Sequence, residues 1–164
     1  MSRPVTEGAM APPRDLLIRP VRPGDFDAWL PLWLGYNAFY GREGPTALPD
    51  AVTRTTWHRF LDHAEPMHAL VAESEGRLLG LAHVLEHRST NRIENVRYLQ
   101  DLYTATDARG RGVGRALVAR VVADARAAGV RRVYWHTHAD NATARRLYDR
   151  VAAHAGFIVY AHDG

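Results

Sequence analysis

A run of alternating glycines, Arg109-Gly-Arg-Gly-Val-Gly-Arg115, most constrains what this chain folds into. Two-periodic residues 98–104 precede the run and predict a strand, and the apolar stripe within residues 113–128 predicts a helix directly after it. Glycines leave the loop backbone accessible, and the free N–H groups of a helix N-terminus attract anions. Three arginines within the run add positive charge. The run therefore predicts a diphosphate-binding loop between a strand and a helix.

Two common kinds of phosphate loop are excluded by the residues around these glycines. A Walker A loop needs lysine and then Ser or Thr after its last glycine, whereas Gly114 is followed by Arg115 and the chain contains no lysine. A dinucleotide fingerprint counted from Gly110 would need Gly or Ala where Arg115 stands. Residues 131–132, near the position of its acidic ribose ligand, are both arginine.

Composition limits the class of protein. A chain of 164 residues with 46% hydrophobic and 24% charged residues predicts one globular domain. The absence of cysteine excludes disulfides, thiolate metal ligands and a cysteine nucleophile. The 21 arginines are dispersed among 18 carboxylates, which argues against nucleic acid as a partner. No apolar run is long enough for a membrane span or a signal peptide, so we expect no membrane partner and a cytoplasmic location.

The order of helical and two-periodic segments predicts the fold. Residues 1–14, rich in proline and small side chains, are expected to be disordered, and residues 15–164 to form one domain. The expected strands are 16–20, 69–73, 78–86, 93–105, 130–137 and 156–160, and the expected helices are 26–37, 50–63, 113–128 and 141–155. The order β-α-α-β-β-β-α-β-α-β predicts an α/β (α+β) domain with a mixed, mostly antiparallel sheet flanked by helices.

Several motifs together resemble one known family. They are the strand Leu99-Gln-Asp-Leu-Tyr-Thr104, the pattern Arg109-x-x-Gly112-x-Gly114, and Asn141-Ala-Thr-Ala-Arg-Arg-Leu-Tyr148 followed by Gly156-Phe-Ile. This combination resembles the GNAT superfamily of acyl-CoA N-acyltransferases over residues 14–162. The segment Pro31–Tyr40 and the residues around Asn141 are similar to the sequences of the branch that contains histone/polyamine-type and D-amino-acid acetyltransferases.

The resemblance implies acetyl-CoA as the co-substrate and names residues for each part of it. Leu102, Tyr103 and Thr104 would pair with the pantetheine arm, Asn141 would contact that arm, and Arg145 would reach a phosphate. The pyrophosphate would lie on the amides of Arg109, Gly110, Arg111, Gly112, Val113, Gly114 and Arg115. No metal is expected, because His136 and His138 share a strand face without a third placed ligand.

The resemblance also implies catalytic roles. Tyr148 would be the general acid that protonates the departing thiolate, and the Tyr103 amide would stabilise the oxyanion. We expect Asp101 to be the general base, with Glu94 and His83 as alternatives. Asp101 alternates with Leu99 and Tyr103 in the sequence, so its side chain is either turned to the cleft or paired with an arginine.

The acceptor is expected to be a primary amine on a small molecule, such as an amino acid or a polyamine, or on a peptide. Trp33, Tyr36 and Tyr40, at the end of the first helix, are the candidate acceptor-binding residues, although Trp33 also suits packing on the sheet. The alternative function is a non-catalytic acyl-CoA-binding sensor, which has no need for Tyr148. Most members end in two strands, whereas this chain has room for one, so we expect a homodimer that covers the open sheet edge.

Overall fold

The computed structural model describes residues 11–163. The strands are β1 (Leu17–Pro20), β2 (Met67–Ser74), β3 (Arg77–His87), β4 (Val96–Thr104) and β5 (Val133–Tyr134). The α-helices are α1 (Phe26–Phe39), α2 (Asp50–Leu61), α3 (Val113–Ala127) and α4 (Ala142–Val151), and 3-10 turns span Pro23–Asp25, Gly44–Thr46 and Thr106–Ala108. This order confirms the predicted α+β class and the predicted element order as far as α4.

The five strands form one sheet in the order β1-β2-β3-β4-β5. The first four strands pair antiparallel, and β5 pairs parallel to β4 through Arg97↔Val133 and Tyr98↔Tyr134. Glu75 and Gly76, with φ of 50° and 72°, make the tight turn between β2 and β3. The predicted mixed, mostly antiparallel sheet is therefore confirmed.

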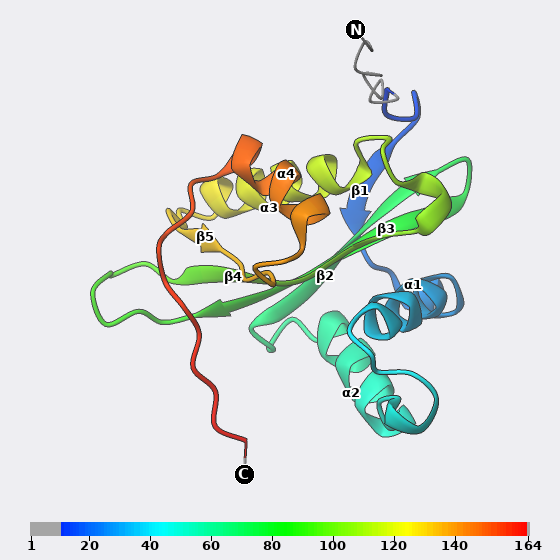
Figure 1. The fold of residues 1–164 in the computed structure, drawn as a ribbon, viewed down its shortest axis with the longest axis horizontal. Coiled ribbons are helices and arrows are strands. Elements are labelled where there is room, and N and C mark those ends of the chain that lie inside the picture. Colours follow the sequence, from blue (N-terminus) through cyan, green and yellow to red (C-terminus); the bar gives the residue numbers. More distant parts are fainter. Residues whose placement is uncertain (1–10, 164) are drawn as a thin grey trace, which may run out of the picture.

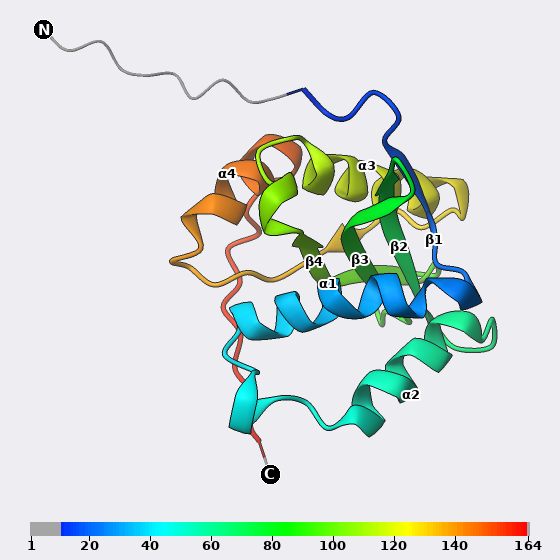
Figure 2. The same ribbon diagram turned by 90° about the vertical axis from the view of Figure 1, so that its right-hand side faces the viewer.

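Helices cover both faces of this sheet (Figures 1 and 2): α3 and α4 lie on one side, and α1 and α2 lie on the other. Successive side chains of a strand point to opposite faces of the sheet, so alternate residues pack in two different cores. Leu70 and Ala72 of β2 pack with α3, whereas Ala69 and Val71 pack with the helices on the opposite face. Trp29 of α1 is fully buried in the second core.

A β-bulge in β4 sets which side chains face the two cores. His83 pairs with Asp101 and Val84 pairs with Leu99, so Gln100 is the extra residue of β4. Leu99 consequently packs in the α3 core, while Tyr103 packs in the α1 core. Asp101 therefore does not share a face with Leu99, although the two lie two residues apart, because the bulge breaks the alternation between them.

The expected final strand, 156–160, does not form within the described residues. After α4 the chain continues without helix or strand, and Phe157, Ile158, Val159 and Tyr160 are 79%, 75%, 63% and 87% exposed. β5 is also shorter than the expected strand 130–137. A strand needs a paired neighbour, and a two-residue β5 offers this segment a very short edge. Figure 1 shows the red C-terminal segment running away from α4.

At the other end of the chain, most of the segment expected to be disordered, residues 1–10, lies outside the described residues. Residues 11–14 are described and lead into β1, and the Leu16 amide donates a hydrogen bond to the Pro13 carbonyl at 3.1 Å.

Candidate functional site

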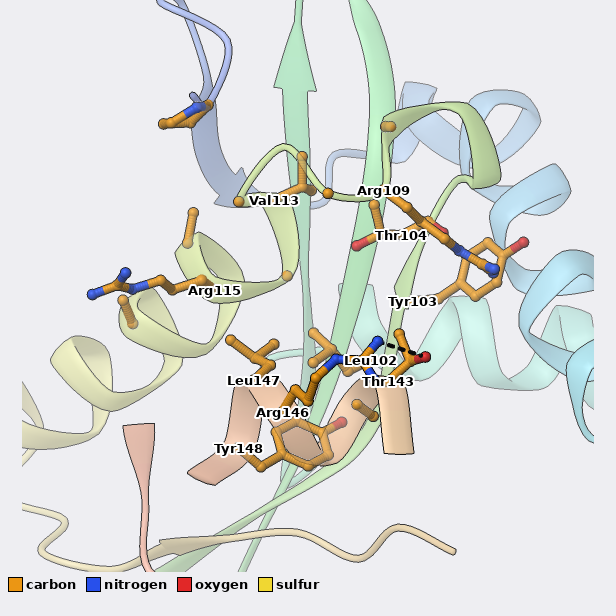
Figure 3. A pocket seen from close by; sticks show the side chains of 18 of the residues that line it. Leu102, Tyr103, Thr104, Arg109, Val113, Arg115, Thr143, Arg146, Leu147 and Tyr148 are labelled. Atoms are coloured by element: carbon orange, nitrogen blue, oxygen red, sulfur yellow. Dashed lines mark hydrogen bonds between the residues drawn. The ribbon is translucent and has the colours of Figure 1, made fainter. Parts of the chain in front are cut away.

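A cleft of about 1060 Å³ opens where β4, the glycine loop, α4 and the C-terminal end of α1 meet. Figure 3 shows the side chains of Leu102, Tyr103 and Thr104 on one wall, and those of Leu147 and Tyr148 on another. A Cβ added at Gly114 would lie 3.5 Å from both Leu147 Cδ2 and Thr104 Oγ1. The start of α3, the end of β4 and α4 therefore converge around this cleft.

The glycine loop has the backbone that an anion site requires. Gly110 and Gly112 have φ of 74° and 76°, in the left-handed region that glycine adopts without penalty. Gly112 is the residue before α3, and no side chain caps the helix at this end. The first amides of α3 therefore remain available, and the helix dipole adds to their attraction for negative charge.

The arginines of the glycine loop point in different directions. Arg109 and Arg115 line the cleft, and Arg109 Nε donates to the Thr104 carbonyl at 3.2 Å. Arg111 is not among the lining residues. A hydrogen bond from Ser74, together with the nearby charge of Arg111, holds the pKa of Asp15 below its usual value, which places Arg111 on the Asp15 side of the loop.

The arginines of α4 that line the cleft are not the one that we expected there. The Arg145 side chain lies outside the cleft lining, and its Nη1 donates to the Ala139 carbonyl at 2.7 Å. Arg146 and Arg150 line the cleft, and Arg146 Nη2 donates to Thr143 Oγ1 at 3.3 Å (Figure 3). Sequence reasoning missed this pair, although their spacing of four residues puts them on one helix face.

Asn141 lines the cleft as expected and also begins α4. Its Oδ1 accepts a hydrogen bond from the Ala144 amide at 3.2 Å, as an N-cap side chain does. This bond leaves the two N–H groups of its amide for a ligand.

Tyr148 presents a protonated phenol to the cleft. Its ring packs against Trp135, with centroids 5.4 Å apart. Burial raises the pKa of Tyr148 to about 12, so the hydroxyl keeps its proton at neutral pH. The side chain is therefore a hydrogen-bond and proton donor inside the cleft.

The orientation of the β4 backbone bears on the Tyr103 amide, which is the expected oxyanion donor. The Ala105 amide donates to the Leu79 carbonyl at 2.8 Å, and a Cβ added at Gly80 would lie 2.7 Å from the Tyr103 carbonyl oxygen. Backbone groups of successive strand residues point to opposite sides, so the amide of Tyr103 also points toward β3. The amides of Leu102 and Thr104 point the other way, beyond the end of β5.

Asp101 and His83 form a buried pair beneath α1. His83 Nδ1 lies 2.9 Å from Asp101 Oδ2, and Trp29 Nε1 donates to His83 Nε2 at 3.0 Å. Because indole only donates, Nε2 must accept, which leaves the imidazole proton on Nδ1, facing Asp101. His83 is therefore neutral with both nitrogens engaged. Neither expected surrounding of Asp101 is observed within residues 11–163: Asp101 is not among the residues that line the cleft, and it pairs with a histidine rather than with an arginine.

Glu94, the third candidate base, lies away from this pair. It precedes β4, whereas the cleft is at the other end of that strand, and its Oε1 is 3.6 Å from Arg92 Nη1.

Two of the three expected acceptor residues line the cleft. Tyr36 and Tyr40 do so together with Phe39, which lies between them in the sequence. Burial raises the pKa of Tyr36, and the charge of Asp101 raises it further, which places this phenol beside that carboxylate. Trp33 belongs to the core: it is 6% exposed and its Nε1 donates to Thr53 Oγ1 at 3.1 Å.

Residues 11–163 contain no group of three or more histidines and carboxylates placed to hold a metal ion. Within the same residues, none of the helices combines the length and apolar character needed to cross a membrane.

Comparisons with known proteins agree with this geometry. Residues 29–153 match the model of the acetyltransferase (GNAT) family. The chain is 35% identical to the D-amino-acid N-acetyltransferase HPA3 of Saccharomyces cerevisiae over 151 residues, which are 91% of each chain. Its fold is similar to a ribosomal-protein-alanine N-acetyltransferase from Brucella melitensis biovar Abortus, with a TM-score of 0.72, 20% identity, and coverage of 91% and 99%. The aminoglycoside enzyme AAC(6')-Iy, solved with a bisubstrate analogue, has a TM-score of 0.77, 18% identity, and coverage of 91% and 98%. The chain therefore belongs to the acetyltransferase (GNAT) family and is an N-acetyltransferase, as its motifs predicted.

Proposed function

We propose that this enzyme transfers the acetyl group of acetyl-CoA to a primary amine of a small molecule or peptide by direct attack. One observation carries the proposal: an uncapped helix N-terminus with a glycine loop and the protonated phenol of Tyr148 line the same cleft. The relative from S. cerevisiae, whose name specifies D-amino acids, supports an amino acid as one acceptor class.

The lining residues suit each part of acetyl-CoA. The amides of Gly112, Val113 and Gly114 suit its pyrophosphate, and Arg115, Arg146 and Arg150 add positive charge along the same cleft. The outward-facing backbone of Leu102 and Thr104, with Asn141 opposite, suits the amide-bearing pantetheine arm. When bound, acetyl-CoA supplies the activated acetyl group as a thioester.

The residues of the chain then divide the proton transfers between them. Tyr148 donates a proton toward the departing sulfur, because burial keeps its phenol protonated. The Leu102 amide, which the register leaves free, stabilises the negative oxygen of the tetrahedral intermediate. Asp101 accepts the proton that the attacking amine loses, with Tyr36 beside it as the relay to the cleft. His83 holds Asp101 in place and takes no proton itself, because its lone pair faces Trp29.

We also propose a homodimer built on the C-terminal segment. Phe157, Ile158, Val159 and Tyr160 form a consecutive run of strand-forming residues that lies exposed beside no other strand of the described chain. The outer edge of β5 is likewise unpaired in that part of the chain. In a homodimer, the C-terminal segment of each chain would pair with the β5 edge of its partner, so that neither the segment nor the edge is left unpaired.

The test of the enzymatic proposal is thiol release from acetyl-CoA with a panel of amines: polyamines, L- and D-amino acids, aminoglycosides and basic peptides. Turnover on one acceptor class supports the proposal and identifies that class. Acetyl-CoA binding without turnover on any amine would instead support the non-catalytic sensor. Because the chain contains no lysine, acetylation of its own lysines cannot contribute to the signal.

A further inference from the structure

Arg42, just beyond α1, carries a positive charge that no acidic side chain neutralises within residues 11–163. Its Nε donates to Asn37 Oδ1 at 2.8 Å, and its amide donates to the Asn37 carbonyl at 2.9 Å. Asn37 is only 2% exposed, and its own Nδ2 donates to the Trp33 carbonyl at 2.8 Å. The guanidinium is therefore fixed in position by a buried side chain, and its two terminal nitrogens remain for a ligand.

The Arg42 guanidinium lies beside the acceptor end of the cleft. Its central carbon is 5.5 Å from the ring centroid of Tyr40 and 5.8 Å from that of Tyr36, and both rings line the cleft. These rings also lie close to each other, with centroids 5.1 Å apart.

Asp101 supplies the opposite charge near the same two rings. It lies 2.9 Å from His83 Nδ1, the His83 ring centroid is 5.2 Å from that of Trp33, and Trp33 stacks on Tyr36 with centroids 5.7 Å apart. Burial is the main cause of the raised pKa of Tyr36 and of Tyr40; Asp101 raises both further, and Arg42 acts in the opposite direction. Two aromatic rings are thus flanked by one negative and one positive side chain. A polyamine places a second ammonium where Arg42 repels it, whereas a zwitterion meets a favourable charge at each end.

We infer that the acceptor is a free amino acid whose carboxylate pairs with Arg42 while its amine faces Asp101 and Tyr36. The inference rests on the proposed acetyl transfer and narrows its acceptor class. A guanidinium whose Nε is already engaged still offers its two terminal nitrogens to both oxygens of a carboxylate. The loss of one such charge-assisted interaction lowers kcat/KM by about 10- to 100-fold.

The test compares three matched forms of alanine and phenylalanine: the free amino acid in D and L configuration, its amide, and the amine without a carboxyl group. In the wild type, kcat/KM should favour the free acid over its amide by about tenfold or more. Arg42→Met should remove this preference through a higher KM for the acid, and should leave the amide unchanged. Arg42→Lys, which keeps the charge, should recover part of the preference.

Arg54→Met is the matched control, because Arg54 also lies over an aromatic ring, Phe26 at 5.9 Å, but is exposed and paired with Asp50. Arg54→Met should change kcat/KM neither for the free acid nor for its amide. Equal turnover of acids and amides by the wild type would overturn the inference, as would a wild-type preference for polyamines. An equal loss on acid and amide in Arg42→Met would overturn it too. Failure to acetylate any amine would instead overturn the proposed function itself.

Discussion

The hydrogen bonds of His83 support the proposed assignment of Asp101 as the general base. Its Nε2 accepts from Trp29 and its Nδ1 faces Asp101, so the imidazole has no free lone pair. Asp101, which is 5% exposed, keeps an oxygen beyond the one that His83 contacts. We therefore propose that the carboxylate accepts the proton and that the histidine positions the carboxylate.

Asp101→Asn tests this assignment with little risk to the fold, because the asparagine oxygen still accepts from His83 Nδ1. We expect kcat/KM for the amine to fall by about 100-fold or more, since general base catalysis contributes that much. The Kd of acetyl-CoA should not change, because Asp101 is not part of the glycine loop. The exposed Asp50→Asn is the control. Full activity in Asp101→Asn would exclude Asp101 as the base.

Sequence reasoning predicted the cleft-lining residues that belong to a local motif, and it missed the contacts that depend on helix rotation or strand register. Asn141, Tyr148 and the loop glycines follow each other closely in the chain, and all line the cleft. The choice between Arg145 and Arg146 depends on how α4 is rotated about its axis, which packing decides. The His83–Asp101 pair joins two strands through a bulge that no local pattern predicts.

A close approach between α1 and β4 fixes one wall of the cleft. A Cβ added at Gly35 of α1 would lie 2.5 Å from the Tyr103 hydroxyl oxygen and 2.9 Å from Tyr103 Cζ. The central guanidinium carbon of Arg109 in turn lies 5.6 Å from the centroid of the Tyr103 ring. The missing side chain at Gly35 therefore lets the Tyr103 ring lie where it supports the glycine loop.

Gly35→Ala should displace the Tyr103 ring, because it is the end of a side chain and moves more easily than the helix. We expect kcat/KM to fall by about tenfold or more, as small misplacements at a reacting centre do. The free energy of unfolding should change by only about 1 kcal/mol, because alanine favours the helix and offsets part of the strain. Gly24→Ala, where no atom lies within 4 Å of the added Cβ, should change neither quantity. Unchanged kinetics in Gly35→Ala would contradict this role of the contact.

At the level of elements, periodicity predicted the four α-helices and the five strands that pair within the described chain. It failed for residues 156–160, whose side chains favour a strand but have no neighbouring strand to pair with. Strand propensity describes a side chain, whereas a strand exists only when its backbone is paired, and pairing is a property of the whole sheet or assembly.

For the whole molecule, Ile158→Asp tests the proposed dimer. Ile158 is 75% exposed in the single chain, so a charge there should leave the isolated fold unaffected, whereas it should break a paired interface. Light scattering over a concentration series should give a dimer for the wild type and a monomer for Ile158→Asp. Ile93→Asp, at an isoleucine that is 97% exposed and far along the chain from the tail, should remain dimeric. A monomeric wild type at every concentration would contradict the proposal.

The proposed site combines an anion-binding loop and a protonated phenol, which line one cleft, with a buried carboxylate that lies outside its lining. The proposed transfer uses the loop to bind acetyl-CoA and Tyr148 to protonate the departing thiolate. A substitution at Tyr148 should therefore lower kcat without changing the acetyl-CoA Kd. Because the pKa of Tyr148 is about 12, this group should cause no loss of wild-type rate up to about pH 10.

The most direct measurement is therefore kcat and the acetyl-CoA Kd of Tyr148→Phe beside the wild type, with Tyr134→Phe, on β5, as the control. We expect kcat in Tyr148→Phe to fall by about 100-fold or more while the acetyl-CoA Kd stays the same, and we expect Tyr134→Phe to match the wild type in both quantities. Wild-type kcat in Tyr148→Phe would contradict the role of the phenol, and undetectable acetyl-CoA binding by the wild type would contradict the loop.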